Sequence, residues 1–193
     1  NVYLHGLVLD AHGKKMSKSK GNVINPLDLT AKYGTDAFRM GLVIGNTPGT
    51  SLALNENRIK GYRNFANKIW NASRFVLINI RDFNHKTKPI LTPKDKKKLK
   101  ELKSFTKQIT KLIDSYKFYL AAEKLYHYFW HIFADKIIEE SKSRLNGENK
   151  KDRRAAQFLL VKYLATLIKM LHPFMPFITE EIWEKLPIKN KKM

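Results

Sequence analysis

The sequence predicts a mainly α-helical protein, an antiparallel helical bundle preceded by a short α/β segment. Three observations predict this class. Apolar residues recur at helical spacing from about residue 56 almost to the end of the chain, short polar connectors separate these stretches, and an apolar run with a glycine opens the chain. With 193 residues, of which 43% are hydrophobic, the chain can build a sizeable core.

The first quarter of the chain predicts one strand, one loop and two helices. Residues 2–9 are apolar, which predicts a short buried strand, and a lysine-rich loop follows them. The pair Asn25-Pro26 begins a helix, because an amide side chain caps the first turn and proline suits the first helical position. Gly34 ends this helix, and a second one covers residues 35–45.

Five further helices are predicted after Asn55. We expect them at residues 56–81, from 93 onward, at 118–145, at 155–171 and from 176 onward. Thr92 caps the second of these, and the pair Asn146-Gly147 stops the third. The change from the mixed segment to continuous helical periodicity divides the chain into two domains, residues 1–54 and 55–193.

The composition indicates which classes of binding partner the protein can have. The net charge of +20 and the isoelectric point near 10.0 favour a polyanion such as RNA, although lysine runs also occur on plain solvated surfaces. The chain has no cysteine, which excludes disulfides and cysteine-ligated zinc and is consistent with a cytoplasmic location. No apolar run approaches the roughly 20 residues of a membrane helix. We therefore expect no membrane association, and no obligate protein partner is evident.

The loop contains the most informative residues, Lys15-Met16-Ser17-Lys18-Ser19. Lysine carries a compact charge on a flexible stem, while serine hydroxyls and backbone amides add hydrogen-bond donors. Such a loop suits a polyphosphate. The alternative is an ordinary solvated loop, the interpretation that we favour for the neighbouring lysines 14 and 20.

The residues on both sides of this loop show a specific resemblance to one protein family. The run 4–28 resembles the second signature of class I aminoacyl-tRNA synthetases, the KMSKS loop, and Lys32–Arg39 resembles the segment that follows it. Residues 63–75, 129–135 and 172–183 fit the same family, and the run 63–75 is most similar to its valine enzymes. Three positions depart from the valine pattern: Leu9, Ser51 and Ala134.

The resemblance implies a role for the loop in binding ATP. In amino-acid activation, pyrophosphate leaves as a carboxylate attacks ATP, and placed cations stabilise the developing charge. The family role falls on Lys15 and Lys18, with Met16, Ser17 and Ser19 shaping the loop. Mg²⁺ is expected to arrive with ATP, because the six histidines are scattered and predict no metal site.

The resemblance also implies that the bundle is an anticodon-binding domain and that its partner is tRNA, most specifically tRNA(Val). The alternatives are the isoleucine enzyme, a stand-alone tRNA-binding module without chemistry, and a generic basic bundle. The other family signature, the tetrapeptide HIGH, does not occur in this sequence. We therefore expect a part of a longer ligase that is inactive by itself.

A polar face on the helix at 56–81 is the candidate tRNA contact. Its members are spaced by three or four residues: Asn64, Asn67, Lys68, Asn71, Arg74 and Phe75. Amides read base edges, cations meet phosphates, and an aromatic ring stacks on an unpaired base. In the alternative interpretation, Asn64, Asn71 and Arg74 hydrogen-bond between helices and hold the bundle together.

For several other residues whose chemistry could suggest a functional site, we expect a role in packing or in ion pairs instead. His5, in the apolar run, is expected to be packed or hydrogen-bonded, and Trp70 to lie in the core. The aromatic residues of positions 116–133 have helical spacing typical of a core. Asp135, Glu139 and Glu140 are expected to form solvated ion pairs, and not a catalytic pair.

Overall fold

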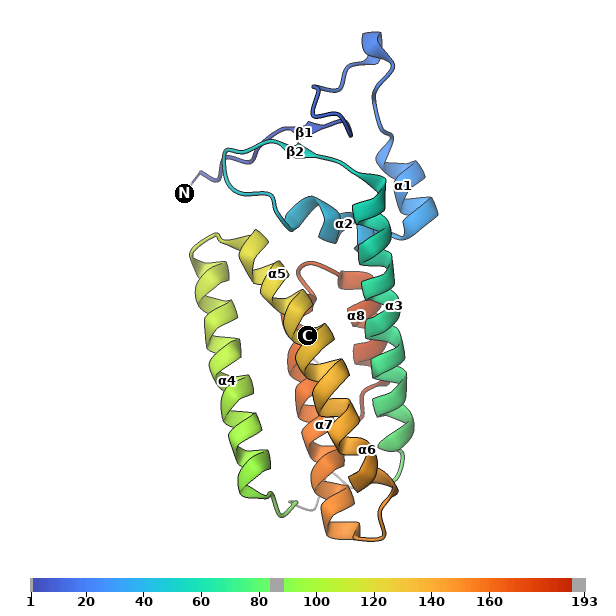
Figure 1. Cartoon of the computed structure of the whole chain (residues 1–193), viewed down its shortest axis with the longest axis vertical. Coiled ribbons are helices and arrows are strands. Elements are labelled where there is room, and N and C mark those ends of the chain that lie inside the picture. The colour runs from blue at the N-terminus through green and yellow to red at the C-terminus, as the bar shows by residue number, and fades with distance from the viewer. Residues whose placement is uncertain (1, 84–88, 189–193) are drawn as a thin grey trace.

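The computed structural model describes residues 2–83 and 89–188. It is an elongated helical bundle with a small α/β segment at one end, as Figure 1 shows, and it confirms the predicted fold class. The elements in order are β1 (Val8–Leu9), the 3₁₀-helix η1 (Lys18–Lys20), α1 (Pro26–Tyr33), α2 (Thr35–Val43), β2 (Leu52–Ala53), α3 (Glu56–Asn79), α4 (Pro93–Asp114), α5 (Phe118–His127), the π-helix η2 (Tyr128–Ile137), α6 (Ile138–Asn146), α7 (Lys150–Leu171) and α8 (Pro176–Lys185). The division at residue 54 stays a prediction.

The N-terminal strand is shorter and more exposed than predicted. Only β1 is strand, and it pairs in parallel with β2, Val8 opposite Leu52. Val2 and Leu4 are 88% and 73% exposed, because β2 is the only strand that pairs with β1 among the described residues. Gly6 lies so close to the segment before β2 that a Cβ would stand 1.6 Å from the carbonyl oxygen of Thr50.

The helices of the α/β segment begin as predicted, and α2 ends at Val43, two residues before the predicted end. The side chain of Asn25 accepts a hydrogen bond from the Leu27 amide (3.1 Å), and Gly34 ends α1 with φ at 91°. A small core joins this segment to the start of α3, and its buried members are Leu29, Ala37, Leu54 and Ile59. Met40 and Ile44 at the end of this segment belong to the large core of the bundle, so the two parts also share apolar contacts there.

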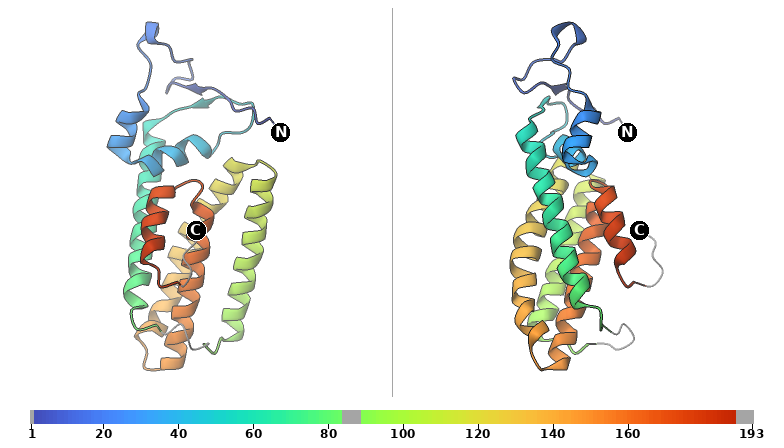
Figure 2. Two further views of the ribbon diagram at one scale, coloured as in Figure 1. Left: turned by 180° about the vertical axis from the view of Figure 1, so that it is seen from behind. Right: turned by 90° about the vertical axis from the view of Figure 1, so that its right-hand side faces the viewer.

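The bundle has one large core, with α7 packed along α4, α6 and α3 (Figures 1 and 2). Phe65, Phe129 and Leu164 are fully buried in it. The bounds of α3 agree with prediction within two residues, and α4 and α8 begin as predicted. In contrast, α7 begins five residues earlier than predicted, because the side chain of Asn149 caps a first turn that is wholly polar.

The helix predicted at 118–145 is continuous, but its middle is π-helical. Ten residues of η2 join α5 to α6 and change the register of the side chains between them. The helix ends at Asn146 as predicted. Its stop does not use a left-handed glycine, since Gly147 is extended with φ at −76°.

Helix α2 fastens the α/β segment to the start of α8. The Asp36 carboxylate accepts hydrogen bonds from the amides of Phe177 (3.2 Å) and Ile178 (2.7 Å), in the first turn of α8. Arg39 donates to the carbonyl oxygen of Pro173 (3.0 Å). No side chain of the α8 segment itself caps this helix, so Asp36 supplies a cap from a distant part of the sequence.

Candidate nucleotide-binding and RNA-binding sites

The lysine loop is shaped by one carboxylate and one amide side chain. Asp10 Oδ1 accepts from the amides of His12 (3.0 Å) and Lys14 (2.8 Å), while Asp10 Oδ2 accepts from Asn22 Nδ2 (2.8 Å). Asn22 Oδ1 in turn accepts from the Ser17 amide (2.9 Å). Asp10 and Asn22 therefore hold the two ends of the loop together.

The predicted ATP residues project from this frame. Lys15 and Lys18 are exposed, and neither pairs with a carboxylate of the described residues. Gly13 and Gly21 bracket the segment with positive φ, 74° and 64°, where side chains are disfavoured. Figure 1 shows η1 at the end of the molecule farthest from α6. Two free ammonium groups thus lie on a loop that is tied at its base.

The other three motif residues make contacts within the loop segment. Met16 is half-buried, and its Sδ accepts a hydrogen bond from the Ile24 amide (3.5 Å). The hydroxyls of Ser17 and Ser19 lie 3.2 Å apart. This arrangement agrees with the shaping role that the family resemblance implies, although the roles of these residues in binding ATP stay predictions.

Sequence reasoning missed the part played by Asp10. The backbone amide of Lys14 and the side chain of Asn22 hold the pKa of this carboxyl below its usual range, with a smaller opposing effect of burial. Asp10 is therefore ionised at neutral pH and accepts three hydrogen bonds. An aspartate before a His-Gly turn was the available signal, because aspartate commonly bonds backbone amides in turns.

The polar face of α3 is mostly open to solvent. Asn64, Asn67, Asn71 and Arg74 are exposed, and none of them hydrogen-bonds to another helix within the described ranges. The alternative interpretation, in which Asn64, Asn71 and Arg74 hold the helices together, is therefore wrong. The assignment of this face to tRNA stays a prediction.

Two members of the face do have partners on the neighbouring helix. Lys68 Nζ lies 2.8 Å from Asp135 Oδ1, and it also lies over the ring of Trp130 (5.5 Å to the centroid). The ion pair with Lys68 is the main reason that the pKa of Asp135 is lowered. Phe75 has Lys142 Nζ above its ring at 5.9 Å. Their partners lie on η2 and α6, so the face continues onto a second helix.

The expected ion pairs are confirmed, whereas the expected burial of Trp70 is wrong. Glu139 pairs with Lys142, and Glu140 pairs with two lysines of α4; these pairs are partly exposed. Trp70 is 40% exposed and does not lie in the core, because its position on α3 faces the shallow side next to α8. His5 is exposed, and it is hydrogen-bonded as expected, since its Nδ1 lies 2.9 Å from the carbonyl oxygen of Gly6.

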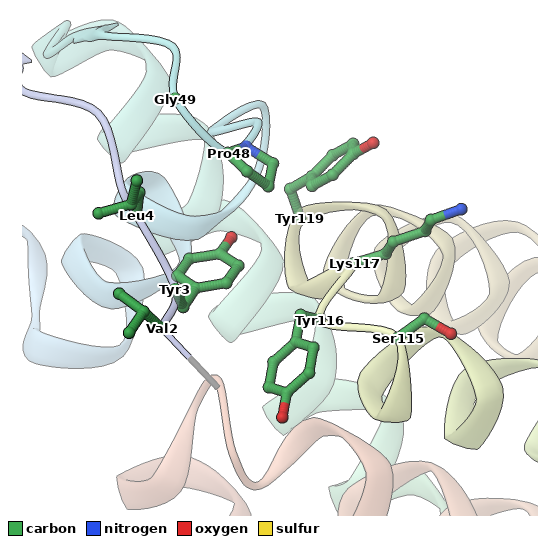
Figure 3. Close-up of a pocket in the computed structure, with 9 residues that line it drawn as sticks. All are labelled: Val2, Tyr3, Leu4, Pro48, Gly49, Ser115, Tyr116, Lys117 and Tyr119. Atoms are coloured by element: carbon green, nitrogen blue, oxygen red, sulfur yellow. The ribbon is translucent and has the colours of Figure 1, made fainter.

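A cavity of about 690 Å³ lies elsewhere. Figure 3 shows it between the N-terminal segment and the turn that joins α4 to α5. Its lining is apolar and aromatic, with Tyr3, Tyr116 and Tyr119 around a single cation, Lys117. None of the predicted ATP or tRNA residues lines it, and one cation does not suit a triphosphate.

Within residues 2–83 and 89–188, histidine, aspartate and glutamate side chains form no cluster that could hold a metal ion. Over the same residues, no helix combines the length and the apolar character that a bilayer span requires.

Comparison with known sequences identifies relatives along the whole chain. A model described as tRNA synthetases class I (I, L, M and V) matches residues 1–55, and the anticodon-binding domain of tRNA ligase matches residues 95–193. The valine–tRNA ligase of Pseudothermotoga lettingae is 45% identical over 100% of this chain and 22% of its own length. That of Syntrophotalea carbinolica is 47% identical over 97% and 21%. The chain spans about a fifth of the length of these relatives.

Solved structures support the same fold at lower identity. The agnB2 LeuRS of Agrobacterium radiobacter K84, in a ternary complex with tRNA and LeuAMS, has a TM-score of 0.72 at 21% identity and covers 96% of this chain and 22% of its own. The methionyl-tRNA synthetase of Mycobacterium tuberculosis with methionyl-adenylate has a TM-score of 0.76 at 20% identity, over 92% and 36%. With the two family matches, this places the chain in the class I aminoacyl-tRNA synthetases, as a region that ends in their anticodon-binding domain.

Proposed function

We propose that this chain supplies the ATP loop and the tRNA-binding bundle of a valine–tRNA ligase. The whole enzyme would join valine to tRNA(Val) through valyl-adenylate, with ATP and Mg²⁺, in the cytoplasm. One observation carries this proposal: valine–tRNA ligases are 42–47% identical to the chain over nearly its whole length. Isoleucine–tRNA ligase is the second candidate, since Leu9 is more typical of that enzyme.

The geometry of the loop supports a role in activation. The carboxylate of the amino acid attacks the α-phosphate of ATP, the bond to the leaving pyrophosphate breaks, and negative charge grows on its oxygens. Lys15 and Lys18 are exposed cations without carboxylate partners among the described residues, so their charge is available. Cations placed where charge develops stabilise the transition state more than the ground state. Mg²⁺ would enter with the phosphates of ATP.

The test is Lys18→Ala in the full-length enzyme, with valine-dependent exchange between ATP and pyrophosphate as the readout. Loss of one such cation should lower the exchange rate by about 10²- to 10³-fold. Lys20→Ala is the matched control, because this lysine is exposed on the same short helix. Equal rates for the two variants would refute the role of Lys18. Exchange with isoleucine and threonine in place of valine decides the amino acid.

The RNA role of the α3 face needs a separate experiment. Its three exposed asparagines and Arg74 offer donors and acceptors that no other helix uses within the described part of the chain. We expect Lys68→Ala and Arg74→Ala each to weaken binding of tRNA(Val), with bulk RNA as competitor. Unchanged affinity in both variants would argue against this face. A protein that binds tRNA(Val) without exchange activity would instead favour a stand-alone module.

A further inference from the structure

A groove lies between the second half of α3 and α8. The left view of Figure 2 shows these two helices from behind. Its volume is about 220 Å³, which is below the roughly 300 Å³ of the smallest typical ligand pockets. A groove of this size has room for one planar ring system, and not for a whole nucleoside triphosphate. The lining residues are Trp70, Ser73, Arg74, Leu77, Ile78, Arg81, Ile182 and Lys185.

The groove combines an apolar surface with a positively charged rim. Trp70 and Ile78 are 40% and 47% exposed, which is unusual for large apolar side chains of one helix face. Three cations, Arg74, Arg81 and Lys185, belong to the lining, and no carboxylate does. Lys185 pairs with Glu181 one turn earlier on α8, so the two arginines are the stronger anion contacts.

The buried hydroxyl of Ser73 is the second observation that points to a ligand. Ser73 is 1% exposed, and its Oγ has no hydrogen-bond partner among the described residues. The hydroxyl of a buried serine in a helix commonly donates a hydrogen bond to the carbonyl oxygen four residues earlier. Ser141 on α6 does so, with Oγ 2.7 Å from the Ile137 carbonyl oxygen. A buried hydroxyl without a partner is costly to the free protein.

We propose that this groove binds one unstacked base of an RNA. The base would stack on Trp70, the neighbouring phosphates would meet Arg74 and Arg81, and the Ser73 hydroxyl would bond the base edge. The proposal rests on the proposed tRNA binding of the bundle and adds a second contact to it. At 3.6 residues per turn, the groove residues form the stripe of α3 next to the polar face, and Arg74 lies on the border.

The first test replaces the stacking ring in the full-length protein, with a tRNA(Val) transcript as the probe. Trp70→Ala should weaken binding by about five- to a hundredfold, because stacking on an aromatic ring contributes that much per base. Trp70→Phe keeps a ring and should retain most of the affinity. Phe177→Ala is the matched control, since this ring is 64% exposed on α8 and outside the groove. Wild-type affinity in Trp70→Ala would overturn the proposal.

The second test uses the hydroxyl. Ser73→Ala should lower the affinity for the transcript about tenfold, as loss of one hydrogen bond to a bound group does. It should not lower the melting temperature, because the hydroxyl has no partner in the free protein. The control is Ser141→Ala, which removes a bonded hydroxyl and should affect stability without affecting the RNA. A Ser73→Ala variant that melts earlier and binds normally would show a structural role only, and would overturn the proposal.

Comparison with Lys68→Ala separates this inference from the proposed function. If Lys68→Ala weakens binding and the groove variants do not, the RNA role stands and the groove proposal is wrong. If the wild-type protein does not bind the transcript, both are wrong. If Trp70→Ala changes the oligomeric state in sedimentation and leaves RNA affinity intact, the groove is a protein interface, and the proposal is wrong.

Discussion

The lysine loop and the bundle use charged side chains in opposite ways. In the bundle, Arg144 donates both terminal nitrogens to Asp95 (2.8 and 3.0 Å), and its Nε reaches Asp152 (2.8 Å). In the loop, the single buried carboxylate, Asp10, accepts from amides, and the lysines keep no carboxylate partner within the described residues. Several cations of the bundle are therefore held in ion pairs, whereas Lys15 and Lys18 of the loop have no carboxylate partner among the described residues.

The difference teaches that net charge alone does not locate a binding site. The chain carries a charge of +20, yet several cations of the bundle, such as Lys98 and Arg153, already pair with carboxylates. A cation contributes less to binding when a carboxylate of the protein already neutralises its charge. Among the described residues, Lys15 and Lys18 of the loop and Arg74 of α3 have no carboxylate partner, whereas Lys68 on the same face of α3 pairs with Asp135.

The largest effect is expected for Arg144→Ala in the bundle. Asp95 is 1% exposed, and burial alone would raise its pKa, but hydrogen bonds from Arg144 and Thr92 hold the pKa below its usual value. Removing the arginine leaves a buried carboxylate without its cation, which costs about 3–5 kcal/mol of unfolding free energy. Urea denaturation followed by circular dichroism measures it.

Lys142→Ala is the control for this prediction. Its pair with Glu139 is about half exposed on both sides, and pairs of this kind contribute roughly 0–1 kcal/mol. Equal losses of unfolding free energy in the two variants would contradict the idea that burial of the pair decides its contribution.

A smaller loss is expected where the two regions join. Asp36→Ala removes the cap of α8, which should cost about 1–2 kcal/mol. The amides of Phe177 and Ile178 should then exchange hydrogen faster, because they lose their acceptor. Asp28→Ala in the exposed first turn of α1 is the control. Unchanged protection of the two amides would show that α8 does not depend on this cap.

The same carboxyl predicts a pH effect of defined sign. Burial raises the pKa of Asp36 above its ordinary value of 3.8, against the opposing hydrogen bonds of the two amides. Between 3.8 and the raised pKa, the folded state binds more protons than the unfolded state, so stability from this group falls as the pH rises through that window. Relative to Asp36→Asn, the wild type should therefore lose stability across it. If the unfolding free energy of the wild type minus that of Asp36→Asn rises with pH in this window, the predicted sign is wrong.

Regular parts of the fold were predictable because their signals are local. Apolar spacing located α3 within two residues of its end, and Thr92 with Asp95 forms the capping box that starts α4. The cap of α8 was not predictable, since Asp36 lies 141 residues before Phe177. The exposure of Trp70 was missed for a related reason, because helical spacing does not tell which face a neighbouring helix leaves uncovered.

The motif of the loop was recognisable from sequence, but the atoms that hold it were not. Lys15 and Lys18 stand out through their spacing and their flanking glycines. The role of Asp10 depends on a turn that brings Asn22 within 2.8 Å of its carboxylate, and such closure is not visible in a pattern of apolar residues. Polar frames of this kind need coordinates to be found.

The smallest effect on global stability, and the sharpest test of the comparison, is expected for Asp10→Ala. This change removes the acceptor of three hydrogen bonds that tie the base of the loop, while the core of the bundle is untouched. Trypsin should then cleave after lysines 14–20 faster than in the wild type, because local opening controls cleavage of a folded chain. The melting temperature of the bundle should not change. Asp28→Ala, an exposed acid outside the loop, should leave cleavage at the wild-type rate. If Asp10→Ala lowers the melting temperature and leaves loop cleavage unchanged, then the carboxylate stabilises the fold as Asp95 does, and the contrast between the two regions fails.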